Sequence, residues 1–191
     1  MQDLINFLLQ YDDLNGTQID LIKSSASVIE LKPDEYFSVA GKIPNKVGFV
    51  SEGILRVCYY NNEGDEITKY FVDENNFVVD YNSFSNQIPS TEYIQAIVPT
   101  QLYVFSVESL QNLSNTILSW DAMMNKIVGK ALMEKVQRIS PMLSEDAKTR
   151  YLEFHKRFPS LVNRIPLNYL ASYIGITKHS LSRIRKELSQ G

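Results

Sequence analysis

Residues that build disulfides and metal centres are scarce in this sequence. Among its 191 residues there is one cysteine, Cys58, and there are two histidines, His155 and His179. A single thiol cannot form an intramolecular disulfide, and neither histidine has a Cys or His neighbour at the spacing of metal ligands. The eight glycines form no phosphate-binding loop and no G-x-S-x-G motif. We therefore expect no metal, no cofactor and no catalytic residue, which argues against a barrel-type enzyme.

Long apolar runs are also missing. No run approaches the roughly 18 residues that a membrane-spanning helix needs. Asp3 stands where the positively charged start of a signal peptide would lie. We expect a cytoplasmic protein with no membrane partner. Its hydrophobic fraction of 44% is ordinary for a globular chain with a packed core.

Acidic and basic residues are unevenly distributed along the chain. Residues 1–140 contain 10 Lys and Arg against 18 Asp and Glu, a net charge of −8. Residues 141–191 contain 9 against 4, a net charge of +5. Such asymmetry is typical of an acidic sensor or interaction domain joined to a basic nucleic-acid-binding domain.

The clearest motif is the segment 167–188, LNYLASYIGITKHSLSRIRKEL, which has the spacing of a helix-turn-helix. Leu170 and Ile174 lie one helical turn apart, and Gly175 follows where a left-handed residue ends a helix. Thr177 can then cap a second helix with its side-chain oxygen. The apolar positions of that second helix share one face, at Leu181, Ile184 and Leu188.

The opposite face of this second helix carries groups that hydrogen-bond to base edges and phosphates. Together with the capping threonine, the candidate DNA-binding residues are Thr177, Lys178, His179, Ser182, Arg183 and Lys186. The alternative is a helical hairpin with a solvated basic face. The joint occurrence of the glycine, the capping threonine and the apolar spacing favours DNA binding.

Upstream, two short amphipathic helical patterns are followed, from Ser27 to Ser106, by short segments rich in Val, Ile, Tyr and Phe between turn residues. This pattern predicts many antiparallel strands in a barrel or a sandwich. At residues 55–60 two sets of side chains alternate, so one face of that strand is expected to be core and the other mixed. Cys58, on the mixed face, is expected to be a packed structural residue of the strand and not a redox sensor.

A broad apolar stripe between Thr116 and Ser140 predicts a long helix that Pro141 stops. We expect a dimer helix, because one small domain is too short to cover the stripe and two-fold DNA readers need a seam. The alternative is a core helix lying on the strands, and both can hold at once. The residues assigned to the dimer helix are Ile117, Trp120, Met124, Ile127 and Ala131. A helix from Ser144 to Phe158 and the helix-turn-helix should then pack a small core of their own.

These residues carry a resemblance to a known family. The segment Ile165–Leu188 resembles the C-terminal helix-turn-helix of the cyclic-AMP receptor (Crp/Fnr) family of bacterial transcription regulators, especially at Gly175, Thr177 and the triplet 182–184. The resemblance implies base-reading positions for Lys178, His179 and Arg183. It also implies that the strands form the β-roll that binds cyclic nucleotides in that family, with turn glycines at Gly41, Gly53 and Gly64.

The sequence departs from the family pattern in two places. Members that bind cyclic nucleotides carry a Gly-Glu pair and an Arg-Ser/Thr-Ala triplet, where this chain has Val79-Asp80 and Ser90-Thr91-Glu92. A buried phosphodiester needs a cation or several donors, but no arginine lies between residues 57 and 137, and Asp80 and Glu92 would oppose a phosphate. The candidate effector pocket is Asp80, Tyr81, Ser90 and Thr91. Family members also commonly continue past the second helix into a β-hairpin wing. This sequence ends three residues after Leu188, so we expect no phosphate contacts from a wing.

The sequence therefore predicts an α+β regulator in three parts. These are an antiparallel β-roll sensor at 1–113, a long dimerisation helix at 114–140 and a helix-turn-helix domain at 141–191. We expect a homodimer that binds double-stranded DNA at a pseudo-palindromic operator, with a sensor that does not bind cyclic AMP. The resemblance implies RNA polymerase and a small-molecule effector as further partners. The alternative is a β-roll ligand-binding or protein-interaction module without DNA binding.

Overall fold

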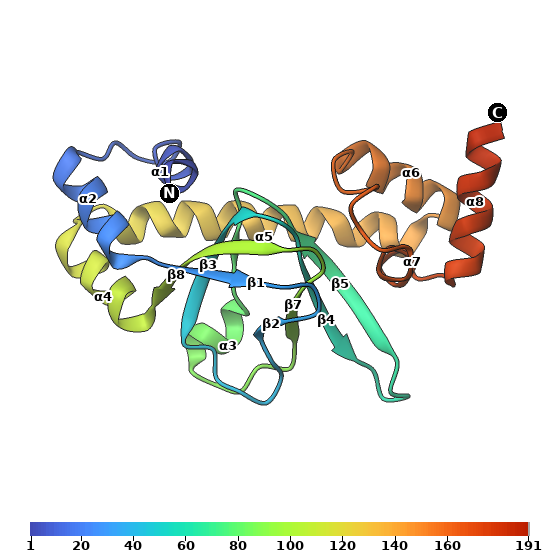
Figure 1. Ribbon diagram of the computed structural model, residues 1–191, viewed down its shortest axis with the longest axis horizontal. Coiled ribbons are helices and arrows are strands. Elements are labelled where there is room, and N and C mark those ends of the chain that lie inside the picture. The colour runs from blue at the N-terminus through green and yellow to red at the C-terminus, as the bar shows by residue number, and fades with distance from the viewer. Residues whose placement is uncertain (191) are drawn as a thin grey trace.

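Two antiparallel sheets and one long helix form the centre of the molecule (Figure 1). The computed structural model describes the backbone of residues 1–190 and the side chains of residues 1–137 and 144–189. The strands are β1 (Ser27–Leu31), β2 (Tyr36–Ser38), β3 (Lys46–Glu52), β4 (Leu55–Tyr60), β5 (Glu66–Val72), β6 (Phe77–Val78), β7 (Tyr93–Ala96) and β8 (Thr100–Ser106). The helices are α1 (Gln2–Leu8), α2 (Gly16–Ser25), α3 (Tyr81–Asn86), α4 (Val107–Thr116), α5 (Trp120–Ser144), α6 (Ala147–Arg157), α7 (Leu167–Ile174) and α8 (Lys178–Gln190).

The two sheets face each other and enclose the interior of the roll. Their strand orders are β1-β8-β3-β6 and β2-β7-β4-β5, with antiparallel pairing throughout. The side chains buried between them are Phe37, Val50, Leu55, Val57, Val72, Val78, Ile94, Ala96, Leu102 and Val104. Since strand residues alternate between faces, the neighbours of these residues point outward. The prediction of an antiparallel barrel or sandwich is confirmed.

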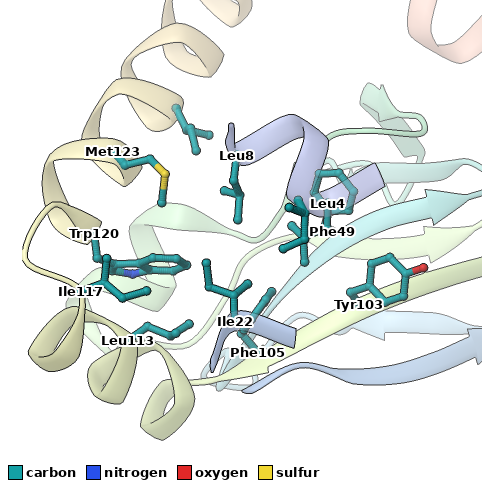
Figure 2. Packing of buried hydrophobic residues seen from close by; sticks show 12 residues of the cluster. Leu4, Leu8, Ile22, Phe49, Tyr103, Phe105, Leu113, Ile117, Trp120 and Met123 are labelled. Atoms are coloured by element: carbon teal, nitrogen blue, oxygen red, sulfur yellow. The ribbon is translucent and has the colours of Figure 1, made fainter. Parts of the chain in front are cut away.

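The outer face of the first sheet is covered by helices from the N-terminal end and from the start of α5. Phe49, Tyr103 and Phe105 extend outward from β3 and β8 into this layer (Figure 2). They pack with helix residues that include Leu4, Leu8, Ile22, Leu113, Ile117, Trp120 and Met123. The N-terminal helices therefore fix the start of α5 against the roll.

The outer face of the second sheet is covered by the C-terminal helices, at the other end of α5 (Figure 1). Three side chains of the roll point outward on this side: Ile54, Phe71 and Ile97. They belong to one buried cluster with Tyr151, Phe154, Leu161, Val162, Ile165, Leu170, Ala171, Ile174 and Leu181. The expectation that the C-terminal segment packs a core of its own is wrong, because the roll completes that core.

Strand β4 has buried side chains on both faces. Leu55 to Cys58 are all buried, including Arg56 on the outward face. The ring of Tyr169 in α7 lies 3.7 Å from the guanidinium carbon of Arg56 and covers it. The alternating pattern indicated a mixed outer face, since a strand's sequence cannot reveal a helix that arrives from far along the chain.

The apolar stripe after the roll is divided between two helices. α4 ends at Thr116, Ile117 is the residue that caps this end, and α5 begins only at Trp120. The prediction that Pro141 stops the long helix is also wrong, because α5 continues to Ser144. Proline removes one N–H donor, and its ring crowds the carbonyl four residues earlier, so it usually kinks or ends a helix, but α5 continues past it. No helix in the described part of the chain is long and apolar enough to cross a membrane.

Helix α6 begins later than the sequence suggested. Ser144 still belongs to α5, so it cannot take the extended conformation of a capping residue. Asp146 caps α6 instead, and its carboxylate accepts the backbone N–H of Thr149 at 2.8 Å. The predicted end of this helix at Phe158, before Pro159, is confirmed.

Gly53 closes the turn between β3 and β4 and should not tolerate a side chain. Its φ is 101°, and a Cβ would stand 2.4 Å from Thr100 Oγ1 and 2.6 Å from Pro99 O. Gly53→Ala should destabilise the fold by about 3 kcal/mol, through left-handed strain and overlap with backbone. Gly41→Ala is the control, because its φ is 83° with nothing within 4 Å, and should cost about 1 kcal/mol. Urea denaturation measures the free energy of unfolding of both variants. Equal losses would contradict the close approach of Thr100 and Pro99 to Gly53.

Candidate nucleic-acid interface

Helices α7 and α8 meet through a short turn that the sequence specifies locally. Gly175 ends α7 with a φ of 77°, a conformation that is cheap only for a residue without a Cβ. Thr177 Oγ1 accepts the backbone N–H of Ser180 at 3.1 Å and so caps α8. Leu181 then buries the inner face of α8 against α7. The predicted turn and cap are confirmed.

Helix α8 lies at the end of the molecule away from α1 and α2 (Figure 1), and the side chains on its outer face are exposed. The exposed candidates on it are Lys178, His179, Ser182, Arg183 and Lys186. Among the residues that the structure describes, no hydrogen bond or ion pair engages their side chains. Their spacing by three, four and eight residues places them on one side of the helix. Thr177 differs from them because its hydroxyl caps the helix.

Two polar residues of this region were not among the sequence candidates. Ser180 is exposed beside Thr177, with 3.0 Å between their hydroxyl oxygens. Arg185 is half-buried, and its Nη2 donates to Asn163 Oδ1 at 3.4 Å. The position of Ser180 in the first turn of α8 could have identified it. The pairing of Arg185 could not be found locally, since Asn163 lies in the preceding loop.

Of the predicted effector residues, Asp80 and Ser90 lie together at the start of α3. Asp80 Oδ1 accepts the Ser83 N–H at 3.2 Å, and Oδ2 accepts the Ser90 hydroxyl at 2.7 Å. Burial alone would raise the pKa of Asp80, but hydrogen bonds from Ser83 and Ser90 outweigh it and hold the pKa below its usual value. The donors that could serve a phosphate therefore already bind a carboxylate. Thr91 is exposed. Tyr81 does not face the same space as Asp80, because it lines a groove along α5.

Two cavities border the start of α3. One of about 300 Å³ lies between the β2–β3 loop and Asp80, with Lys42 and Lys46 in its wall. The other is a groove of about 530 Å³ along α5, lined from α3, α4 and the roll by residues that include Val79, Tyr81, Phe84 and Leu110. Both sizes fall in the range of ligand pockets, roughly 300–1,000 Å³. Within the described ranges, no group of three or more His, Cys, Asp or Glu is placed to hold a metal.

The residues assigned to the dimer helix differ in how deeply the chain buries them. Ile117 and Trp120 are buried in the layer that α1 and α2 complete (Figure 2), and Ile127 belongs to the same buried cluster. Met124 is half-buried against this layer, and Ala131 is exposed. The groove along α5 is lined by Met124 and Ala131 and also by Trp120 and Ile127. The groove also contains Val128 and Leu132, and Val136 follows one turn after Leu132. We call Met124, Val128, Ala131, Leu132 and Val136 the outer face of α5. The side chain of Ile139 lies outside the described residues.

Cys58 is fully buried in β4. Burial raises the pKa of its thiol to about 11, so the nucleophilic thiolate is scarce near neutral pH. The structure agrees with the interpretation of Cys58 as a packed strand residue.

A β-roll, a long helix and a helix-turn-helix thus follow one another in this chain. Residues 28–116 match the family model of the cyclic nucleotide-binding domain. The chain is similar to CLP of Xanthomonas campestris, a c-di-GMP responsive global regulator, with a TM-score of 0.73 and 16% identity over 92% of each chain. No curated protein matches the sequence.

Two further solved structures share the arrangement. A putative transcriptional regulator of the Crp/Fnr family from Eubacterium rectale has a TM-score of 0.71 and 18% identity, over 96% of this chain and 88% of that one. The catabolite activator protein of Thermus thermophilus has a TM-score of 0.59 and 16% identity, over 96% and 87%. At these identities the likeness establishes the fold, which this chain shares with Crp/Fnr regulators.

Proposed function

We propose that the protein is a dimeric, sequence-specific DNA-binding transcription regulator of the Crp/Fnr family, cytoplasmic and without enzymatic activity. The observation that carries the proposal is the exposed outer face of α8, where five polar or basic side chains have no partner within the described part of the chain. DNA binding requires cations for phosphates and donors for base edges, and this face supplies both. The net charge of +5 in residues 141–191 supports the same partner.

Arg183 and Lys186 should contribute to DNA binding in different ways. Arg183→Ala is expected to cost about 1–3 kcal/mol at one base position, because arginine typically reads guanine bidentately. Lys186→Ala should weaken binding to all sequences alike, since it contacts phosphate. Lys156→Ala removes the same charge from exposed α6 and is the control. Titrations at fixed salt against operator and base-substituted duplexes measure this, and unchanged binding by both variants would refute the assignment.

We propose that the partner subunit packs along the outer face of α5. Leu132 and Val136 are large apolar side chains with 48% and 61% of their surface exposed. The groove extends this apolar surface toward α3 and α4. Exposed apolar surface of this extent marks an interaction site, and two-fold symmetry lets one helix face serve both subunits. The proposed seam keeps Met124 and Ala131 of the sequence-based assignment and adds Val128, Leu132 and Val136, all of which are half-buried or exposed.

We further propose that the roll does not recognise a cyclic nucleotide through a phosphate clamp. The carboxylate of Asp80 holds the Ser90 hydroxyl, and the nearby cation Lys69 is paired with Glu92. The cavity of about 300 Å³ beside Asp80 is the place where another small-molecule effector would fit. RNA polymerase, as a partner, remains a prediction from the family resemblance.

A further inference from the structure

The helix-turn-helix packs directly against the roll of its own chain, so the two are held together by side-chain contacts and not only by the connecting helix. Phe71 of β5 points outward, and its ring centroid lies 5.6 Å from that of Tyr173 and 6.1 Å from that of Phe154. The neighbouring side chain, Val72, is buried inside the roll. Strand β5 therefore packs against the interior of the roll with one face and against the C-terminal helices with the other.

Ser172 of α7 takes the place of a neighbouring strand along part of β5. β5 is the last strand of its sheet, so its outer backbone groups have no strand partner. Ser172 Oγ accepts the N–H of Thr68 at 2.9 Å and donates to the carbonyl of Glu66 at 3.2 Å. These two hydrogen bonds fix the position of α7 along the strand.

Arg56 fixes the position of α7 across the sheet. Its side chain is only 1% exposed, with Nη2 at 2.8 Å from Glu66 Oε2 and 2.6 Å from Gln95 Oε1. Those partners belong to the roll, whereas Tyr169 comes from α7 and covers the guanidinium at 3.7 Å. The Tyr169 hydroxyl also donates to Asp34 Oδ1 at 3.3 Å.

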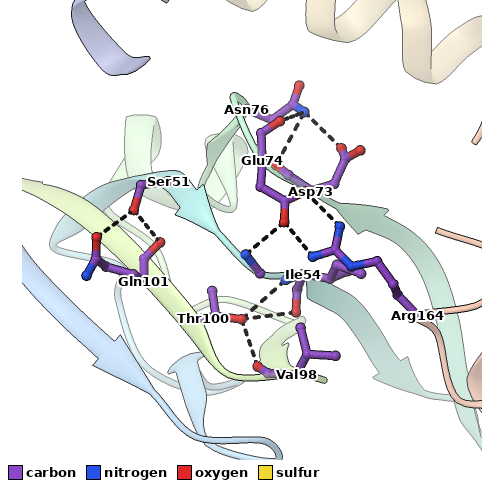
Figure 3. A network of polar contacts seen from close by, with 10 residues as sticks. Ser51, Ile54, Asp73, Glu74, Asn76, Val98, Thr100, Gln101 and Arg164 are labelled. Atoms are coloured by element: carbon purple, nitrogen blue, oxygen red, sulfur yellow. Dashed lines mark hydrogen bonds and ion pairs between the residues drawn. The ribbon is translucent and has the colours of Figure 1, made fainter. Parts of the chain in front are cut away.

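A third contact lies at the loop before α7. Arg164 Nη1 donates to Glu74 Oε2 at 3.0 Å, and Glu74 Oε1 accepts the Gly53 N–H at 3.0 Å (Figure 3). This ion pair is partly exposed, so it contributes little energy by itself. Together with the contacts of Tyr169, Ser172 and Tyr173 on α7, it fixes the orientation of the helix-turn-helix.

We propose that Arg56 is a positioning residue for DNA recognition. A buried ion pair adds little stability over an apolar replacement, but it can select one docking geometry. α8 is fixed to α7 by the turn at Gly175 and by Leu181, so the orientation of α7 determines that of the recognition helix. In a two-fold dimer, that orientation sets the distance between the two recognition helices. The inference rests on the proposed function.

The test separates positioning from folding by comparing two kinds of DNA. The variants are Arg56→Met, Tyr169→Leu and Ser172→Ala. The control is Lys69→Gln, on β5 but paired with Glu92. The probes are a pseudo-palindrome selected from random DNA by the wild-type protein, the same site with two base pairs inserted at its centre, and a single half-site.

Each variant except the control should bind the full site about tenfold or more weakly, because misplaced recognition helices lose simultaneous engagement. Half-site binding should stay within about twofold of wild type, and discrimination against the inserted spacing should shrink. Equal losses on half-site and full site, or no loss on either, would overturn the proposal.

The docking is also measurable without DNA. Hydrogen exchange at the Thr68 amide should accelerate in Arg56→Met and Ser172→Ala and stay unchanged in Lys69→Gln, because Ser172 protects that amide. Unchanged exchange in the first two variants would overturn the docking itself. A wild-type protein that selects no DNA, but shows the expected exchange, would reject the proposed function and leave the docked joint established.

Discussion

Neither cyclic AMP nor cyclic GMP should bind the roll more tightly than about millimolar. A buried phosphodiester needs a cation or several donors, and no arginine lies between residues 57 and 137. The hydroxyl of Ser90 and the N–H of Ser83 already bind the Asp80 carboxylate. Lys42 and Lys46 lie in the wall of the cavity beside Asp80, but Lys42 is exposed, Lys46 lies over the ring of Phe37, and the Asp80 carboxylate opposes an anion in the same cavity. Loss of a hydrogen-bonded arginine partner typically costs several kcal/mol, and about 4 kcal/mol separates micromolar from millimolar affinity.

Calorimetry with adenosine as the matched control tests this expectation. Adenosine carries the same base and sugar without the phosphate, so a site that lacks a clamp should bind it no more weakly than cyclic AMP. Micromolar binding of a cyclic nucleotide, with tighter DNA binding in its presence, would contradict the account. That result would require a phosphate clamp formed by other residues.

Leu132→Glu should dissociate the dimer. On a two-fold axis, one substitution buries two like charges, and desolvating a charge without an opposite partner costs several kcal/mol. A cost of about 4 kcal/mol raises the dimer dissociation constant about 1000-fold. Binding to a pseudo-palindrome should fall with it, because each monomer then engages only one half-site.

Gln137→Glu is the control for this substitution. It adds the same charge on the opposite side of α5, at an exposed position. Sedimentation of both variants at micromolar concentration gives the comparison: a monomer for Leu132→Glu and an unchanged dimer for Gln137→Glu. A Leu132→Glu protein that sediments as the wild type would reject the outer face of α5 as the dimer surface, while leaving the DNA-binding face of α8 untested by this experiment.

Features with local causes were predictable from the sequence. Gly175 and Thr177 fix the end of one helix and the start of the next within three residues, and the structure has both where predicted. Turns and short segments also sufficed to predict antiparallel strands. The sequence misled at Pro141. A proline lacks the backbone N–H donor of a helical residue and was expected to stop the long helix, but α5 continues to Ser144.

Features that depend on contacts between distant residues were not predictable. The apolar stripe after Thr116 gave no sign that α1 and α2 would bury Ile117, Trp120 and Ile127. Similarly, Ser172 and Thr68 are separated by 104 positions, and nothing in either segment identifies the other as its partner. The alternating pattern of β4 placed Arg56 on an outer face, but nothing near it in the sequence indicated that Tyr169 of α7 would cover that face.

Whether the outer face of α8 binds specific DNA sequences is tested by selection from random duplexes followed by salt titration. We expect enrichment of a pseudo-palindrome whose half-sites lie about one helical turn, roughly 34 Å, apart. Affinity for that site should fall steeply with salt, with a log–log slope near −0.9 for each phosphate contacted. The absence of an enriched sequence, or an affinity that does not change with ionic strength, would contradict DNA binding by this face.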